Sequence, residues 1–88
     1  MRLQGRVALL AGAGPGMGRA TALLFAQHGA RVAVVARTET NGIETAQRIS
    51  AAGGTAMALS ADLADGAAAQ HAVQQVVATY GRLDILYF

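Results

Sequence analysis

Residues 6–19 read RVALLAGAGPGMGR, and this stretch decides the fold. Its first six residues form a short apolar run that ends at Gly12, which predicts a strand buried on both faces, as in a parallel sheet. The segment that follows, residues 16–28, shows helical spacing and ends at the stop signal Gly29. The residues at this helical spacing are Ala20, Leu23, Leu24 and Gln27. A glycine-rich turn between a strand and a helix is the context in which such loops bind nucleotide phosphates.

The rest of the chain repeats the same alternation. Further strands are predicted at residues 31–36 (RVAVVA), 55–60 (TAMALS, the weakest) and 83–88 (LDILYF), and further helices at residues 40–52 and 65–80. The first of these helices places Ile43, Ala46 and Ile49 on one apolar face. The second places Val73, Val76, Val77 and Tyr80 on another.

Four strands alternating with three helices over short connections predict an α/β architecture with right-handed crossovers. We expect a Rossmann-like, three-layer αβα fold with about four parallel strands in the order 3-2-1-4. The whole chain, residues 1–88, is predicted to be one dinucleotide-binding domain that is incomplete at its C-terminus.

Composition excludes several classes of protein. Hydrophobic residues make up 53% and charged residues 14%, too apolar a mixture for disorder. No apolar run approaches the roughly 20 residues of a membrane span, and the N-terminal stretch is too short for a secretory signal. The absence of cysteine excludes disulfides and thiolate metal sites and fits a cytoplasmic protein.

The charged and histidine residues predict neither a nucleic-acid partner nor a metal site. The net charge is +2, and the seven arginines are scattered along the chain with no basic run. His28 and His71 fall on different predicted helices without ligand spacing.

Each glycine of the loop has a physical role in nucleotide binding. Gly12 makes the tight turn out of the strand, Gly16 lets the backbone approach a pyrophosphate, and Gly18 allows the helix to pack on the strand. The amides and the positive dipole end of the helix then face the phosphates. The alternative is a purely structural turn. A Walker loop is excluded because no Gly-Lys-Ser/Thr ending is present, and Met17 stands where G-x-G-x-x-G, counted from Gly12, requires its third glycine.

The spacing Gly12, Gly16, Gly18 instead resembles the G-x-x-x-G-x-G loop of the short-chain dehydrogenase/reductase family. The resemblance covers the whole chain, through Ala36-Arg37, residues 61–63 (ADL) and residues 80–86 (YGRLDIL). One departure is Ala11, where the family usually has threonine. The resemblance implies an NAD(P)-binding oxidoreductase that, when complete, transfers hydride between the dinucleotide and a carbonyl/alcohol substrate.

The end of the second strand favours NADP(H). NAD-preferring folds place an acid there to bind the ribose hydroxyls, whereas this chain has Ala36 followed by Arg37. A guanidinium can pair with the 2′-phosphate through two parallel N–H bonds, and Thr38 can add a hydroxyl contact. Two alternatives remain: Arg37 as a solvated strand-end residue, and NAD(H) binding through the nearby Glu39.

The resemblance also implies contacts to the adenine after the third strand. Asp62 would bind its exocyclic amine and Leu63 would lie beside the ring. The alternative for Asp62 is a helix N-cap, for which Asp65 is better placed. The predicted cofactor-binding set is Gly12, Gly14, Gly16, Met17, Gly18, Arg37, Thr38, Asp62 and Leu63.

The family's catalytic residues do not occur in this chain. The resemblance implies an Asn-Asn-Ala-Gly run, a serine and a Tyr-x-x-x-Lys pair, but the sequence contains no lysine, and Tyr80 is followed four residues later by Asp84. We therefore expect nucleotide binding without turnover and assign no catalytic residue.

Other interpretations remain open. The chain could be a non-catalytic nucleotide-binding module or a truncated product without function; a methyltransferase is disfavoured by Ala36-Arg37. Strand 83–88 would form an exposed apolar edge, which predicts self-association or incomplete folding.

Overall fold

The computed structural model describes residues 2–12 and 16–87, without the side chain of Met17. In chain order these residues form β1 (Val7–Ala11), α1 (Met17–Gln27), β2 (Arg31–Ala36), α2 (Glu39–Ala51), β3 (Thr55–Ser60), α3 (Gly66–Tyr80) and β4 (Ile85–Tyr87). Every predicted element is confirmed in type. The largest difference is at β4, where Leu83 and Asp84 precede the strand and Phe88 lies outside the described residues.

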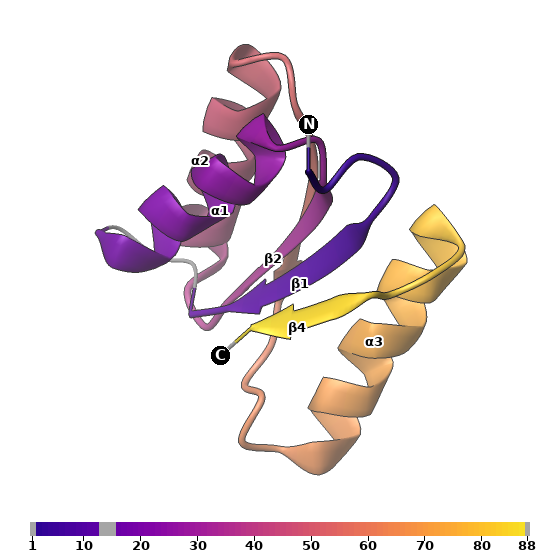
Figure 1. Cartoon of the computed structure of the whole chain (residues 1–88). Helices are drawn as coiled ribbons and strands as arrows, with labels where there is room; N and C mark the ends of the chain where they lie inside the picture. The colour runs from indigo at the N-terminus through magenta and orange to yellow at the C-terminus, as the bar shows by residue number, and fades with distance from the viewer. Residues whose placement is uncertain (1, 13–15, 88) are drawn as a thin grey trace.

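All pairs of neighbouring strands are parallel, and the sheet order is β3-β2-β1-β4, as predicted. In the register, Ala8 lies between Val32 on β2 and Ile85 on β4. Helices α1 and α2 cover one face of the sheet and α3 covers the other, which gives the predicted three layers (Figure 1). Parallel pairing brings the carboxyl ends of the strands to one edge, and the glycine loop leaves β1 at that edge.

The core lies on both faces of the two central strands. Alternate residues of β1 and β2 pack with α1 and α2 on one side, and the residues between them pack against α3 on the other. Both sets are at most 1% exposed from Val7 to Leu10 and from Val32 to Val35. This burial confirms the prediction of strands buried on both faces.

Only part of each apolar helix face is buried, because small residues also turn toward the sheet. On α2 the buried residues are Gly42, Thr45 and Ile49, while Ile43 is 40% exposed. A Cβ at Gly42 would lie only 3.5 Å from the Ala36 Cβ. Helix and sheet are therefore in close contact at Gly42, where an isoleucine side chain would not fit.

The other two helices show the same arrangement. Among the described side chains of α1, Ala22 is buried, whereas Leu24 is 51% exposed. On α3 the buried residues are Ala72 and Val76, while Val77 is 42% exposed.

The ends of α3 follow from identifiable capping residues. The Asp65 carboxylate accepts hydrogen bonds from the amides of Ala67 (3.0 Å) and Ala68 (3.5 Å). Gly81 ends the helix in the left-handed conformation at φ 84°. Asp65 is thus the N-cap, as preferred over Asp62 from the sequence.

Candidate nucleotide-binding edge

Two glycines of the loop adopt backbone conformations that favour glycine. Gly12, directly after β1, has φ 72°, and its amide donates to the Val35 carbonyl at 2.9 Å. Gly16, the N-cap of α1, has φ 93°. A Cβ at either position would meet nothing within 4 Å among the described residues, which do not include residues 13–15. Gly14 and the side chain of Met17 lie outside the described residues.

No side chain among the described residues caps the N-terminus of α1. The N-cap residue is Gly16, which has no side chain that could accept a hydrogen bond from the helix. The first turn of α1 carries no acidic residue. The amides of a first helical turn lack partners within the helix, and they carry partial positive charge. This end of α1 is therefore suited to an anionic group of a ligand.

Arg37 and Asp62 meet across the carboxyl ends of two neighbouring strands. Ala36 pairs with Ser60 in the sheet, which brings the residues that follow β2 and β3 together. The Arg37 Nη2 lies 4.0 Å from the Asp62 Oδ2, and the two side chains are 81% and 53% exposed. The other carboxylate oxygen of Asp62 accepts a hydrogen bond from the Ala64 amide at 3.0 Å. An exposed pair at this distance is weak, so the guanidinium remains accessible to another anion.

The position that carries an acid in NAD-preferring folds holds a small apolar side chain. Ala36 is 5% exposed and ends β2, and the exposed residues Arg37 and Thr38 follow. Glu39 is the first residue of α2 and is exposed. Arg37, Thr38 and Asp62 thus lie at one edge of the sheet with Gly12, while Leu63 is half-buried and packs against the core beneath α3.

Sequence reasoning missed Arg19, which joins the glycine loop to α2. Its Nε donates to the Thr45 hydroxyl at 3.1 Å, and its Nη1 donates to Glu44 Oε1 at 3.4 Å. The side chain is only 13% exposed, and its Nη2 is buried without a hydrogen-bond partner among the described residues. The available signal was a charged residue directly after Gly18 in an otherwise apolar helix.

Glu44 is held ionised by two arginines. Its carboxylate accepts a hydrogen bond from Arg48 at 3.1 Å, one turn further along α2. That hydrogen bond, followed by the charge of Arg19, lowers the pKa of Glu44 below its usual value. The Arg19, Glu44 and Arg48 chain therefore links the first turn of α1 to the outer face of α2.

Tyr80 is unsuited to acid/base chemistry. Partial burial raises the pKa of its hydroxyl, although the charge of Arg31 acts in the opposite direction. The Arg31 guanidinium lies over the Tyr80 ring, 5.5 Å from its centroid. A tyrosine acid/base requires a lowered pKa, so this contact is better explained as packing between β2 and α3.

Two hollows of the described structure lie away from this edge. One of about 230 Å³ lies between the C-terminal halves of α1 and α2 and is lined by Leu23, Ala26, Gln27, Ile49, Ala52, Gly53 and Gly54. A smaller one of about 140 Å³ adjoins it beside the amino ends of β2 and β3. Neither of these two hollows is lined by a described residue of the predicted cofactor-binding set.

Within residues 2–12 and 16–87, no group of three or more histidine, aspartate or glutamate side chains is arranged to hold a metal ion. None of the described helices has the length and apolar character needed to cross a membrane.

Comparison with known proteins identifies the family. The family model described as short chain dehydrogenase matches residues 6–88. An uncharacterized oxidoreductase of Thermotoga maritima is 43% identical over 86 residues, which is 98% of this chain and 34% of that protein. The short-chain dehydrogenase/reductase homolog YusS of Bacillus subtilis is 38% identical over 98% of this chain and 80% of its own length.

Comparison with solved structures gives the same family as the sequence comparison. A metagenomic short-chain oxidoreductase solved in complex with NADP superposes with a TM-score of 0.91 at 36% identity. The match covers 98% of this chain and 39% of that one. The chain thus spans about a third of the length of the Thermotoga protein and most of the length of YusS. With its matching sheet order and a family match that runs from Arg6 to the last residue, the chain belongs to the short-chain dehydrogenase family.

Proposed function

We propose that this chain binds NADP(H) at the carboxyl edge of its sheet. The pyrophosphate would lie on the glycine loop and the N-terminus of α1, and the adenosine 2′-phosphate would lie at Arg37. The observation that carries the proposal is the exposed Arg37 guanidinium directly after β2, where Ala36 leaves no carboxylate at the strand end.

The geometry of the glycine loop supports the pyrophosphate position. Gly12 and Gly16 both have positive φ, and no atom of the described part of the chain lies within 4 Å of the place where a Cβ would project. The uncapped N-terminus of α1 offers amide donors and a favourable dipole to an anion. Gly14, Met17 and Gly18 complete the proposed contacts of the loop.

Four residues beyond the loop would contact the adenosine. Arg37 would pair with the 2′-phosphate and Thr38 would add its hydroxyl, while Asp62 and Leu63 would contact the adenine. Asp62 uses one carboxylate oxygen for the Ala64 amide and directs the other toward Arg37, so one oxygen remains available to an adenine amine. NAD(H) binding is the alternative, with Glu39 near the ribose.

The proposal for the whole-protein activity comes from the family. Bound NADP(H) supplies a hydride donor or acceptor at its nicotinamide ring. The corresponding function is oxidoreduction of a carbonyl/alcohol pair, and the 88 residues contain no lysine for a Tyr-x-x-x-Lys pair. We therefore propose that this chain binds the nucleotide without turnover.

Calorimetric titration of the 88-residue chain at fixed ionic strength tests this function. We expect NADP(H) to bind more tightly than NAD(H). Arg37→Gln should raise the Kd for NADP(H) by about tenfold or more and leave that for NAD(H) nearly unchanged, since only NADP(H) carries the 2′-phosphate.

Arg2→Gln is the matched control. It removes an exposed arginine beside Leu3, whose amide donates to the His28 carbonyl at the opposite edge of the sheet. Equal affinity for the two nucleotides, or the same loss from Arg2→Gln as from Arg37→Gln, would contradict the role of Arg37. A folded chain that binds neither nucleotide would contradict the function.

We also propose that two copies of this chain associate through β4. β4 lies at one end of the sheet order, and its three residues carry no charge. Leu86 and Tyr87 are 51% and 43% exposed. Edge strands without charge or proline pair readily with another chain.

Sedimentation over a range of concentrations tests the association. Leu86→Lys places a charge on the edge and should shift the chain toward monomer. Leu24→Lys is the matched control, because Leu24 is also 51% exposed but lies on α1. A wild-type chain that stays monomeric throughout, or equal effects of both variants, would overturn the proposal.

A further inference from the structure

Arg19 is a largely buried cation that shares its carboxylate partner with a second arginine. Its side chain is 13% exposed, and its Nη1 lies 3.4 Å from Glu44 Oε1. The Arg48 Nη2 lies 3.1 Å from the same oxygen. Within the described residues, Glu44 is the one carboxylate that pairs with Arg19. Two guanidinium groups therefore face a single negative charge, which leaves an excess of positive charge where α1 meets α2.

The other nitrogens of Arg19 do not balance this charge. The Nε donates to the Thr45 hydroxyl, a neutral acceptor, at 3.1 Å. The Nη2 is buried and has no hydrogen-bond partner in the described part of the chain. Burying a cation with an unsatisfied donor costs free energy. Most buried polar atoms of native proteins have a partner, so this exception needs an explanation.

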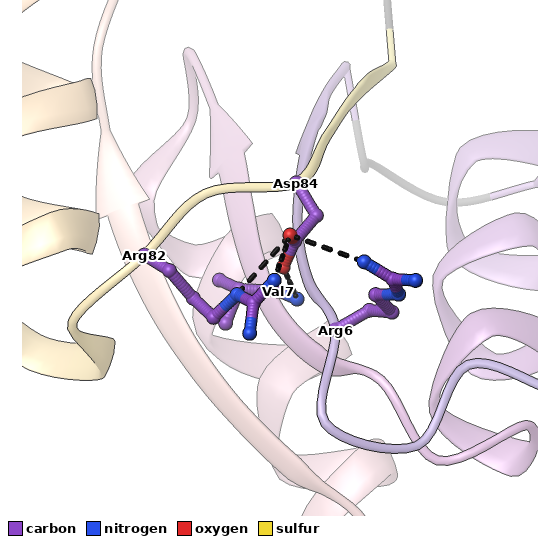
Figure 2. A network of polar contacts seen from close by, with 4 residues as sticks. All are labelled: Arg6, Val7, Arg82 and Asp84. Atoms are coloured by element: carbon purple, nitrogen blue, oxygen red, sulfur yellow. Dashed lines mark hydrogen bonds and ion pairs between the residues drawn. The ribbon is translucent and has the colours of Figure 1, made fainter.

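The arginine cluster at the opposite edge of the sheet has the reverse arrangement. Figure 2 shows the Asp84 carboxylate between Arg82, at 2.6 Å, and Arg6, at 3.6 Å. There the carboxylate is the shielded group, at 15% exposed, and the two arginines are 52% and 56% exposed. At Arg19 the cation is shielded, and the Glu44 carboxylate is 47% exposed. Water screens the charge of Arg19 less than it screens the charges of Arg6 and Arg82.

A cation is also unfavourable at this place in the helix. Arg19 is the third residue of α1 and its only charged one. The Ala20 amide donates to the Gly16 carbonyl at 3.0 Å, so Arg19 lies within the first helical turn. The helix dipole makes this end partly positive, which disfavours a cation and favours an anion. The charge of Arg19 and the dipole therefore both raise the positive potential at the N-terminus of α1.

We propose that Arg19 supplies the shielded positive charge that draws the diphosphate of a dinucleotide to the N-terminus of α1. The inference rests on the proposed function and gives the two arginines of this site separate tasks. Arg37, which is 81% exposed, serves the 2′-phosphate and so distinguishes NADP(H) from NAD(H). Arg19 acts through its electric field on the diphosphate that both nucleotides carry, and Thr45 and Glu44 hold its guanidinium in place.

Calorimetric titration of the 88-residue chain with NADP(H) and NAD(H) tests the proposal. Arg19→Met removes the charge and keeps an unbranched side chain. We expect it to raise the Kd of both nucleotides by the same factor, about fivefold or more, so that their ratio is unchanged. Arg19→Lys keeps the charge without the planar guanidinium, and it should retain most of the affinity. A residue that only joined α1 to α2 through its hydrogen bonds would not be rescued by lysine.

Arg48→Gln is the matched control, because it removes the other arginine of Glu44, which is 56% exposed and lies near the C-terminal end of α2. It should leave both Kd values nearly unchanged. Thermal unfolding of each free variant checks that it is folded, and Arg19→Gln, whose amide can still donate to Thr45, replaces Arg19→Met if that variant does not fold.

Three results would overturn the proposal while leaving the proposed function intact. They are a folded, neutral Arg19 variant that binds both nucleotides like the wild type, a loss confined to NADP(H), and an equal loss from Arg19→Lys or Arg48→Gln. A folded wild-type chain that binds neither nucleotide would instead overturn the proposed function, and this inference with it.

Discussion

The guanidinium of Arg37 and the carboxylate of Asp62 lie 4.0 Å apart across the ends of β2 and β3. The sequence predicts different contacts for these residues, the first with the 2′-phosphate and the second with the adenine. In the structure they form an ion pair with each other. A nucleotide that bound between them would replace this weak ion pair with its own contacts. Because the Asp62 carboxylate is negatively charged, it repels a phosphate that approaches Arg37.

Neutralising Asp62 should therefore strengthen NADP(H) binding. Asp62→Asn keeps one acceptor oxygen for the Ala64 amide and removes the negative charge beside Arg37. We expect calorimetry to show a several-fold lower Kd for NADP(H), a smaller change for NAD(H), and a difference that shrinks with added salt. Weaker binding of both nucleotides would contradict this expectation and show that the second carboxylate oxygen of Asp62 matters more for adenine than its charge does for the phosphate.

Stability should fall in acid partly through Asp84. Because hydrogen bonds from Arg82 and Val7 lower its pKa, the ionised carboxylate contributes stability that is complete above the usual pKa of aspartate. This contribution is lost as the pH falls through the lowered value. Denaturant unfolding of the wild type and Asp84→Asn should give a difference in free energy of unfolding at neutral pH that narrows below about pH 4. A difference independent of pH would contradict the assignment.

The contact between Arg19 and Thr45 should contribute to packing of α1 on α2. Thr45 is 0% exposed, and Thr45→Val would leave the partly buried Arg19 Nε without this acceptor. We expect a loss of about 1–3 kcal/mol in the free energy of unfolding. The loss should be smaller in an Arg19→Met background, and the exposed Thr40→Val is the matched control. Equal losses in both backgrounds would show that the two residues are not coupled.

Replacing glycine with alanine should have opposite effects on the free energy of unfolding at two positions. Gly29 has φ 93°, and a Cβ there would lie 2.9 Å from the Gln4 Cα, so Gly29→Ala should cost at least about 1–2 kcal/mol. Gly66 is the first residue of α3 and has nothing within 4 Å of the Cβ position. Gly66→Ala should therefore raise the free energy of unfolding by about 0.4–1 kcal/mol. Thermal unfolding measures both, and destabilisation by Gly66→Ala would contradict this explanation.

Much of the fold could be predicted because the signals are local. The apolar runs at residues 31–36 and 55–60 coincide with β2 and β3, and Asp65 and Gly81 bound α3 as their chemistry predicts. The alternation of strand and helix then leaves few topologies, because parallel crossovers have one favoured hand. The position of the glycine loop and of Arg37 at one edge follows from that topology.

What the sequence determined by itself was the order and type of its elements, the sheet order and the edge that holds the candidate site. The tertiary structure decided which residues of each helix are buried, since Gly42 and Ala72 are buried while Ile43 and Val77 are 40% and 42% exposed. It also decided the contacts of Arg19 with Thr45 and of Asp84 with Val7, which are 26 and 77 residues apart in the chain. Periodicity reports which residues share a face of one element, but partners across elements are set by how closely the backbones approach.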